Sequence, residues 1–158
     1  MSSQFGLERS LVLIKPDAIQ RGLTGEIISR IERRGLKILA TKMLQMDKAL
    51  AQRHYAIHKG KGFFDDLVSF ITSSPIVAIV FQGKNSVEII RQTMGETDPA
   101  RAKPGTIRGD FGVDISHNVI HGSDSVESAL KEIELFFSPE EIFDYKRDID
   151  KWIVGEDG

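Results

Sequence analysis

The chain has 158 residues, no cysteine and a formal net charge of −2 at pH 7, with 41% hydrophobic and 28% charged residues. This length suits one domain with a sizeable core, so we expect residues 1–158 to form a single domain. The absence of cysteine excludes disulfides, zinc–thiolate sites and a cysteine nucleophile, and the small negative charge argues against nucleic acid as the main partner.

The sequence predicts strands and helices that alternate loosely. In the first half we expect a buried strand over Leu11–Ile14, a helix from Thr24 to Arg34, a strand from Leu36 to Met46, a helix from Asp47 to about His58 and a helix over Phe63–Ile71. In the second half we expect a strand over Pro75–Phe81, a helix from Asn85 to Met94, a strand around Asn118–Ile120, a helix from Ser123 or Ser125 and a final helix from Ser138 toward Trp152.

Two patterns predict helix starts with particular clarity. Asn85, with Glu88 three residues later, resembles a capping box. Ser138-Pro139-Glu140-Glu141 places serine at the N-cap, proline at the first helical position and glutamate at the third. The order of elements favours an α+β fold over a doubly wound sheet. We expect a ferredoxin-like split βαβ sandwich, in which helices pack on a four-stranded antiparallel sheet.

No segment predicts a membrane or secreted protein. None approaches the ~20 consecutive apolar residues of a membrane helix. The start, Met1–Gly6, lacks the basic and apolar regions of a signal peptide. We therefore expect a cytoplasmic protein without a membrane partner.

The run Asn118–Ser125 places one histidine, His121, between a predicted strand and the start of a helix. Helix N-terminal N–H groups and hydroxyls commonly hold phosphate. The loop 95–112 precedes this run, and such a long loop in a compact domain is usually functional or disordered. We favour a functional loop, because its cations would lie close to His121. A nucleophilic histidine beside anion-binding groups points to phosphoryl transfer through a phosphohistidine, although a lone histidine is more often merely hydrogen-bonded.

With these segments side by side, the chain resembles the nucleoside diphosphate kinases from about residue 8 to residue 152. The matching segments are Glu8-Arg9, Ile14–Asp17, Gln20–Gly22, Gly25–Ile28, His54-Tyr55, Phe63-Phe64, Gly95–Ala100, Pro104–Phe111 and Asn118–Ser125. The resemblance implies transfer of the terminal phosphate from a nucleoside triphosphate to a nucleoside diphosphate. It also implies a ping-pong mechanism, usually with Mg²⁺.

The resemblance also assigns roles to residues. His121 would be the nucleophile, Glu132 and Ser123 would orient its ring, and Tyr55 would pack nearby. The residues implied to bind the nucleotide are Lys15, Phe63, Arg91, Thr97, Arg108 and Asn118. Of these, the cations would neutralise phosphates, Lys15 and Asn118 would contact the ribose, and Phe63 would stack on the base. We expect Mg²⁺ to arrive on the nucleotide phosphates rather than at a metal site built from the protein, with Asp124 as an outer-sphere candidate.

Structural roles compete with several of these assignments. Arg91 could pair with Glu88 on the same helix, Tyr55 is equally consistent with packing, and we assign Phe64 to the core. The other histidines receive weaker or structural roles: His58 could reach the α-phosphate, and His54 and His117 would be structural or surface residues.

Two further expectations concern assembly and an alternative function. The tail Lys151–Gly158 resembles the longer tails that pack across subunits, so we expect a homo-oligomer, with a hexamer favoured over a tetramer. The alternative function is that of a catalytically silent regulatory protein that binds nucleotides or nucleic acid. The complete set of phosphate-binding cations favours the enzyme.

Overall fold

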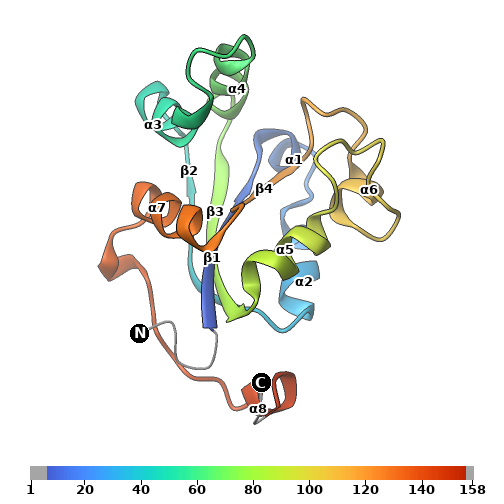
Figure 1. Ribbon diagram of the computed structural model, residues 1–158, viewed down its shortest axis with the longest axis vertical. Coiled ribbons are helices and arrows are strands. Elements are labelled where there is room, and N and C mark those ends of the chain that lie inside the picture. Colours follow the sequence, from blue (N-terminus) through green and yellow to red (C-terminus); the bar gives the residue numbers. More distant parts are fainter. Residues whose placement is uncertain (1–6, 156–158) are drawn as a thin grey trace.

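The computed structural model describes residues 7–155 of the chain (Figure 1). The expectation for Met1–Gly6 and the last three residues of the predicted oligomer contact lie outside the described residues. Within residues 7–155, no helix is long and apolar enough to cross a membrane.

The fold is built on one antiparallel sheet of four strands, in the order β2-β3-β1-β4. The strands are β1 (Leu7–Ile14), β2 (Lys37–Leu44), β3 (Ile76–Lys84) and β4 (Ile120–Gly122). The two central strands pair from Leu7 opposite Lys84 to Ile14 opposite Val77. The predicted four-stranded antiparallel sheet is therefore confirmed.

Helices cover both faces of this sheet (Figure 1). They are α1 (Pro16–Gln20), α2 (Thr24–Arg33), α3 (Lys48–His54), α4 (Phe64–Ile71), α5 (Ser86–Met94), α6 (Ile107–Phe111), α7 (Val126–Phe136) and α8 (Asp150–Ile153), with 3-10 turns η2 (Ala56–His58) and η3 (Pro139–Glu141). Side chains of β1 alternate between two cores, as a pleated strand requires. Leu11 and Leu13 pack in the core shared with α3, α4 and α7, whereas Val12 and Ile14 pack with α2 and α5.

The predicted final helix from Ser138 to Trp152 is wrong. Its capping box forms between Ser138 and Glu141, but it supports only the turn η3. The chain then runs beside β2, where the Phe143 amide donates to the Leu39 carbonyl at 2.9 Å and the Tyr145 hydroxyl donates to the Ile38 carbonyl at 2.5 Å. Hydrogen bonds to an edge strand replace those of a helix, so tertiary contacts override the local start signal.

The predicted capping box at Asn85 is also wrong. Asn85 adopts a left-handed conformation with φ 55°, and its side chain makes no cap hydrogen bond within residues 7–155. Glu8 caps the start of α5 instead. Its carboxylate accepts from the Val87 amide at 3.4 Å, and its carbonyl accepts from the Ser86 hydroxyl at 2.8 Å. The cap of α5 thus comes from β1, which is distant in sequence.

Smaller differences occur around the predicted loops. The predicted helix Asp47–His58 is interrupted at Tyr55. The strand expected around Asn118–Ile120 is displaced to β4. The loop 95–112 contains α6, which begins after Thr106, whose hydroxyl accepts from the Gly109 amide at 3.0 Å.

Candidate active site

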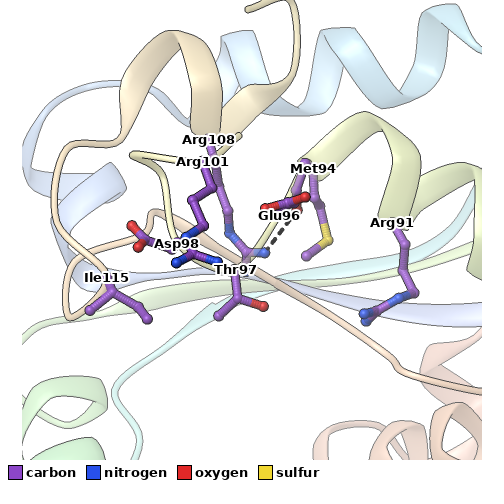
Figure 2. Close-up of a pocket in the computed structure, with 9 residues that line it drawn as sticks. Arg91, Met94, Glu96, Thr97, Asp98, Arg101, Arg108 and Ile115 are labelled. Atoms are coloured by element: carbon purple, nitrogen blue, oxygen red, sulfur yellow. Dashed lines mark hydrogen bonds between the residues drawn. The ribbon is translucent and has the colours of Figure 1, made fainter. Parts of the chain in front are cut away.

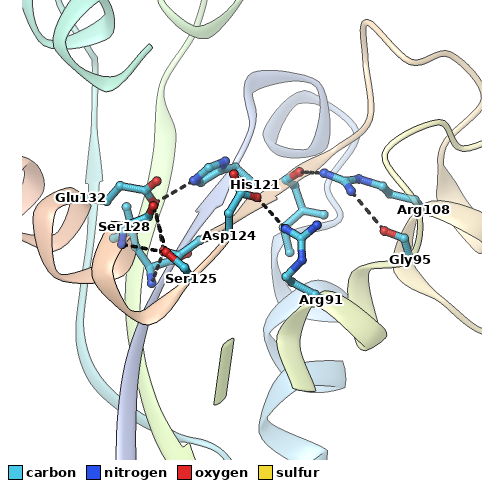
Figure 3. A network of polar contacts seen from close by, with 11 residues as sticks. Arg91, Gly95, Arg108, His121, Asp124, Ser125, Ser128 and Glu132 are labelled. Carbon is cyan, nitrogen blue, oxygen red and sulfur yellow. Dashed lines mark hydrogen bonds and ion pairs between the residues drawn. The ribbon is translucent and has the colours of Figure 1, made fainter. Parts of the chain in front are cut away.

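His121 lies on β4, opposite Leu13 of β1. Its Nε2 is 2.9 Å from Glu132 Oε1, and the Ser123 hydroxyl donates to the same oxygen at 2.9 Å (Figure 3). Glu132 lies on α7, which begins where the Ser125 hydroxyl accepts from the Ser128 amide. The expected contact of His121 with Glu132 is therefore present. In a neutral imidazole, an Nε2–H that donates to a carboxylate leaves the lone pair on Nδ1.

The backbone just before His121 is strained. Val119 is fully buried and has φ +66°, a conformation that a β-branched residue rarely adopts and that costs about 1–3 kcal/mol. Asp17 stabilises it by accepting from the Val119 amide at 3.1 Å, and the Lys15 amide donates to the Val119 carbonyl at 3.0 Å. The Lys-Pro-Asp turn after β1 thus fixes the segment that carries Asn118 and His121.

Lys15 and Asn118 form the centre of a polar chain. Lys15 Nζ donates to Asn118 Oδ1 at 2.7 Å, and Asn118 Nδ2 donates to the Thr97 carbonyl at 2.9 Å. Burial lowers the pKa of Lys15 to about 8, and the positive charge of Arg108 adds to this effect, while Asp17 opposes it. A desolvated cation of this kind is prepared to receive an anionic ligand, because an added negative charge offsets the cost of its burial.

Arg108 is a buried cation that also holds the site together. Its guanidinium donates to three backbone carbonyls, those of Asn118 (3.2 Å), Gly95 (3.2 Å) and Ile120 (2.6 Å). Burial, followed by the charge of Arg91, lowers the pKa of Arg108 to about 10. A guanidinium has five N–H donors, so Arg108 can tie α6 to β4 and still offer hydrogen bonds to a ligand.

A pocket of about 500 Å³ opens beside these cations (Figure 2). Its lining contains the predicted residues Arg91, Thr97 and Arg108 together with Met94, Gly95, Glu96, Asp98, Arg101 and Ile115. The individual roles of these six added residues were not predicted, although the charge-rich composition of the loop 95–112 indicated a site. The pocket therefore lies between the end of α5 and this loop.

Arg91 pairs across the site rather than along its own helix. Its Nη1 lies 2.7 Å from Asp124 Oδ1, and the two side chains are 42% and 81% exposed. Glu88 instead accepts from Gln92 at 3.5 Å. An ion pair this exposed is worth at most about 1 kcal/mol, so a phosphate group can replace Asp124 as the partner of Arg91 at little cost.

The aromatic residues lie on the segment from α3 to α4. Phe63 is 48% exposed, whereas Phe64 is buried as expected. The Phe63 ring centroid is 5.3 Å from that of His58, and Lys61 Nζ lies 5.7 Å from the Phe63 centroid. Phe63 is thus a half-exposed ring that lies near the Lys61 ammonium and the His58 ring. Tyr55 is buried, and burial followed by the charge of Glu132 raises its pKa to about 12, so the hydroxyl stays protonated.

His54 is a residue whose position the sequence did not indicate. Its ring packs against that of His121 with a centroid distance of 4.7 Å and an interplanar angle of 83°. We expected a structural or surface role for His54. The structure adds a direct contact between its ring and that of His121, the predicted nucleophile. Its only signal was its place beside Tyr55 in a matching segment.

Comparison with known proteins shows to which family the chain belongs. The family model for nucleoside diphosphate kinase matches residues 8–142. The nucleoside diphosphate kinase of Roseiflexus sp. (strain RS-1) is 56% identical over 147 residues, which are 93% of this chain and 99% of the relative. That of Thermomicrobium roseum is 54% identical over 149 residues, which are 94% of this chain and 100% of the relative.

Solved structures give the same result. A halophilic nucleoside diphosphate kinase from Halobacterium salinarum, in complex with CDP, superposes with a TM-score of 0.91 at 49% identity, covering 93% of this chain and 98% of that one. A nucleoside diphosphate kinase family protein from Babesia bovis superposes with a TM-score of 0.90 at 41% identity, covering 93% and 99%. The chain therefore belongs to the nucleoside diphosphate kinase family of phosphotransferases.

Proposed function

We propose that this protein transfers the terminal phosphate of a nucleoside triphosphate to a nucleoside diphosphate in a Mg²⁺-dependent ping-pong reaction through phosphorylated His121. The observation that carries the proposal is the contact of His121 Nε2 with Glu132 at 2.9 Å, which leaves Nδ1 as the nucleophilic nitrogen.

In the first half-reaction, the Nδ1 lone pair attacks the terminal phosphorus. An N–P bond forms as the bond from phosphorus to the bridging oxygen breaks, and the nucleoside diphosphate leaves with that electron pair. Positive charge develops on the ring, and Glu132 stabilises it through Nε2–H. In the second half-reaction, a terminal oxygen of another nucleoside diphosphate attacks the same phosphorus, and the N–P electron pair returns to Nδ1.

The cations serve to position and neutralise the phosphates. Lys15 and Arg108 are desolvated, so their attraction for a bound anion is stronger than in water. Arg91 exchanges Asp124 for a phosphate oxygen, and Thr97 adds a hydroxyl to the pocket. Phosphoryl transfer depends mainly on such positioning and charge neutralisation.

Bound Mg²⁺ would supply further neutralisation of the phosphate oxygens. Asp124 suits an ion carried by the nucleotide, because its carboxylate is exposed and reaches the phosphate-binding Arg91. Mg²⁺ usually keeps several waters and takes only one or two carboxylates. Asp124 would therefore hold a water of the ion when Arg91 turns to the phosphates.

The nucleoside would lie between Phe63 and the Lys15–Asn118 pair. The solved relative from Halobacterium salinarum is in complex with CDP, which supports a nucleotide at this site. Stacking on Phe63 requires only a π-face, so we expect little discrimination among bases.

We also propose a homo-oligomer, with a hexamer favoured over a tetramer. Large apolar side chains lie exposed on the segment 113–115 and near the C-terminus: Val113 (85%), Ile115 (56%), Phe143 (66%) and Trp152 (81%). Such exposure supports contact with further copies of the chain. The cytoplasmic location stays a prediction from the sequence.

The test is to incubate the protein with Mg²⁺ and γ-labelled ATP without an acceptor, beside His121→Ala and His117→Ala. His117 is a matched control, because it is exposed and contacts the Phe70 ring. We expect acid-labile label on the wild type and the His117 variant, released by GDP, and none on His121→Ala. Label on all three proteins would refute the role of His121. Nucleotide binding without any label would refute the ping-pong mechanism and favour the regulatory alternative.

A further inference from the structure

The geometry points to a second ligand at the nucleophile: we infer that His54, His121 and Glu132 form a site for a borderline transition-metal ion such as Zn²⁺, which blocks phosphoryl transfer when it binds. The inhibitory part of this inference rests on the proposed role of His121, whereas the metal site itself does not.

The first observation concerns His54. Both of its ring nitrogens are buried, and neither has a hydrogen-bond partner in the part of the chain that the structure describes. Its neighbours are the rings of Tyr55 (4.6 Å), His121 (4.7 Å) and Phe136 (5.6 Å), measured between centroids. Buried polar groups are nearly always satisfied, and an unsatisfied nitrogen costs about 1–3 kcal/mol. A metal ion would bind a ring-nitrogen lone pair that accepts no hydrogen bond from the described residues.

The second observation is convergence. One ligand atom each from His54, His121 and Glu132 lies within 4.8 Å of the other two. Tetrahedral zinc, with bonds of about 2.0–2.1 Å, requires ligand atoms about 3.3 Å apart. His121 Nε2 and Glu132 Oε1 are 2.9 Å apart across a hydrogen bond, so the carboxylate must move back slightly for an ion to replace the proton between them. Turning the His54 ring toward this pair would break no hydrogen bond, because the ring makes none among the described residues.

The donor set selects the class of metal. Two imidazoles and one carboxylate are a known ligand set for zinc, and three protein ligands leave a fourth position for water. Mg²⁺ prefers an octahedral shell of oxygens, so it competes poorly here. This site is therefore chemically distinct from the phosphate-borne Mg²⁺ of the proposed reaction.

Metal binding would act on His121 through its tautomer. A metal ion takes the Nε2 lone pair of a neutral imidazole, so the ring proton must move from Nε2 to Nδ1. When it moves to Nδ1, that nitrogen has no lone pair with which to attack phosphorus. Glu132 at the same time exchanges its hydrogen bond to the ring for a bond to the metal. Both changes oppose formation of the phosphohistidine, and a chelator reverses them.

Binding is tested first, with Co²⁺ and Zn²⁺ in the absence of nucleotide. We expect one equivalent of Co²⁺ per chain, with the intense visible absorption of a tetrahedral N/O site, and displacement of Co²⁺ by Zn²⁺. His54→Phe retains an aromatic ring but no ligand, and should weaken Zn²⁺ binding by more than the roughly 10–100-fold that loss of an outer-shell partner costs. His54→Gln serves as a second variant if the phenylalanine variant does not fold, and His117→Gln is the control that should bind like the wild type. No stoichiometric metal on the wild type, or unchanged affinity in a folded His54 variant, overturns the site.

Inhibition is tested separately. The protein is loaded with Zn²⁺, freed of excess metal and then mixed with Mg²⁺ and γ-labelled ATP; we expect labelling of His121 to fall at least about tenfold and to return with a chelator. Binding without loss of labelling keeps the site but overturns its inhibitory role. Stoichiometric binding in a protein that is never labelled keeps the site and refutes only the proposed function.

Discussion

We expect Lys15 to make folding stability and activity depend on pH in opposite directions. Its pKa is about 8 in the folded protein, against 10.5 for an exposed lysine, mainly because the ammonium is buried. Between these values the unfolded chain binds more protons than the folded one, so the free energy of unfolding rises with pH. A difference of about 2.5 units corresponds to about 3 kcal/mol. This stabilisation is fully present above pH 10.5 and is lost as pH falls through 8.

The measurement compares the wild type with Lys15→Met across pH 7 to 10.5. Urea unfolding at one fixed protein concentration gives the free energy of unfolding of both proteins. All other titrating groups are shared, so the difference should shift by about 3 kcal/mol in favour of the wild type as pH rises. A difference that stays constant over this range would refute the buried, charged state of Lys15.

The activity of the wild type should change the other way. Above pH 8 the free enzyme loses the ammonium that attracts phosphate, so kcat/KM should fall with the loss of one proton. An unchanged kcat/KM up to pH 10 would show that Lys15 does not bind the phosphates as a cation.

Two further substitutions test the site and its scaffold. Glu132→Gln removes the charge that we propose stabilises His121 during phosphorylation, so steady-state phosphate exchange should show kcat lower by about 10²-fold. A loss below threefold would contradict this role. Gly109→Ala would place a Cβ against the Lys103 carbonyl and should lower the free energy of unfolding by about 1–3 kcal/mol. Gly25→Ala is its helical control, because no atom of residues 7–155 outside the local helix backbone lies within 4 Å of the added Cβ. This variant should gain up to about 1 kcal/mol. Equal urea midpoints for the two alanine variants would show that the Lys103 contact relaxes without cost.

Elements with a clear apolar period could be predicted from the sequence. The strand over Leu11–Ile14 is fully buried, and the helix from Thr24 ends at Arg33, within one residue of the expected position. The failures are places where a distant segment supplies the hydrogen bonds. Glu8 caps α5 in place of Asn85, and β2 holds the chain after Ser138 extended. Local patterns contain no information about such partners.

The candidate site likewise contains some features that the sequence indicated and others that depend on tertiary packing. The resemblance implied that Ser123 and Glu132 orient His121, and both side chains do lie in contact around that ring. The contact of His54 with His121 joins α3 to β4, and it depends on how both elements pack on the sheet. The unsatisfied nitrogens of His54 become visible only once the surrounding side chains are placed.

Rigidity at the nucleophile follows from strain and burial together. The positive φ of Val119 is unfavourable by itself, so the segment would relax if its anchors were weak. Arg108 opposes relaxation from one side, since it donates to the carbonyls of Asn118 and Ile120 on either side of Val119. Asp17 opposes it from the other by accepting the Val119 amide. The cation that we propose to bind phosphate therefore also fixes the backbone beside His121, which places the imidazole before any ligand binds.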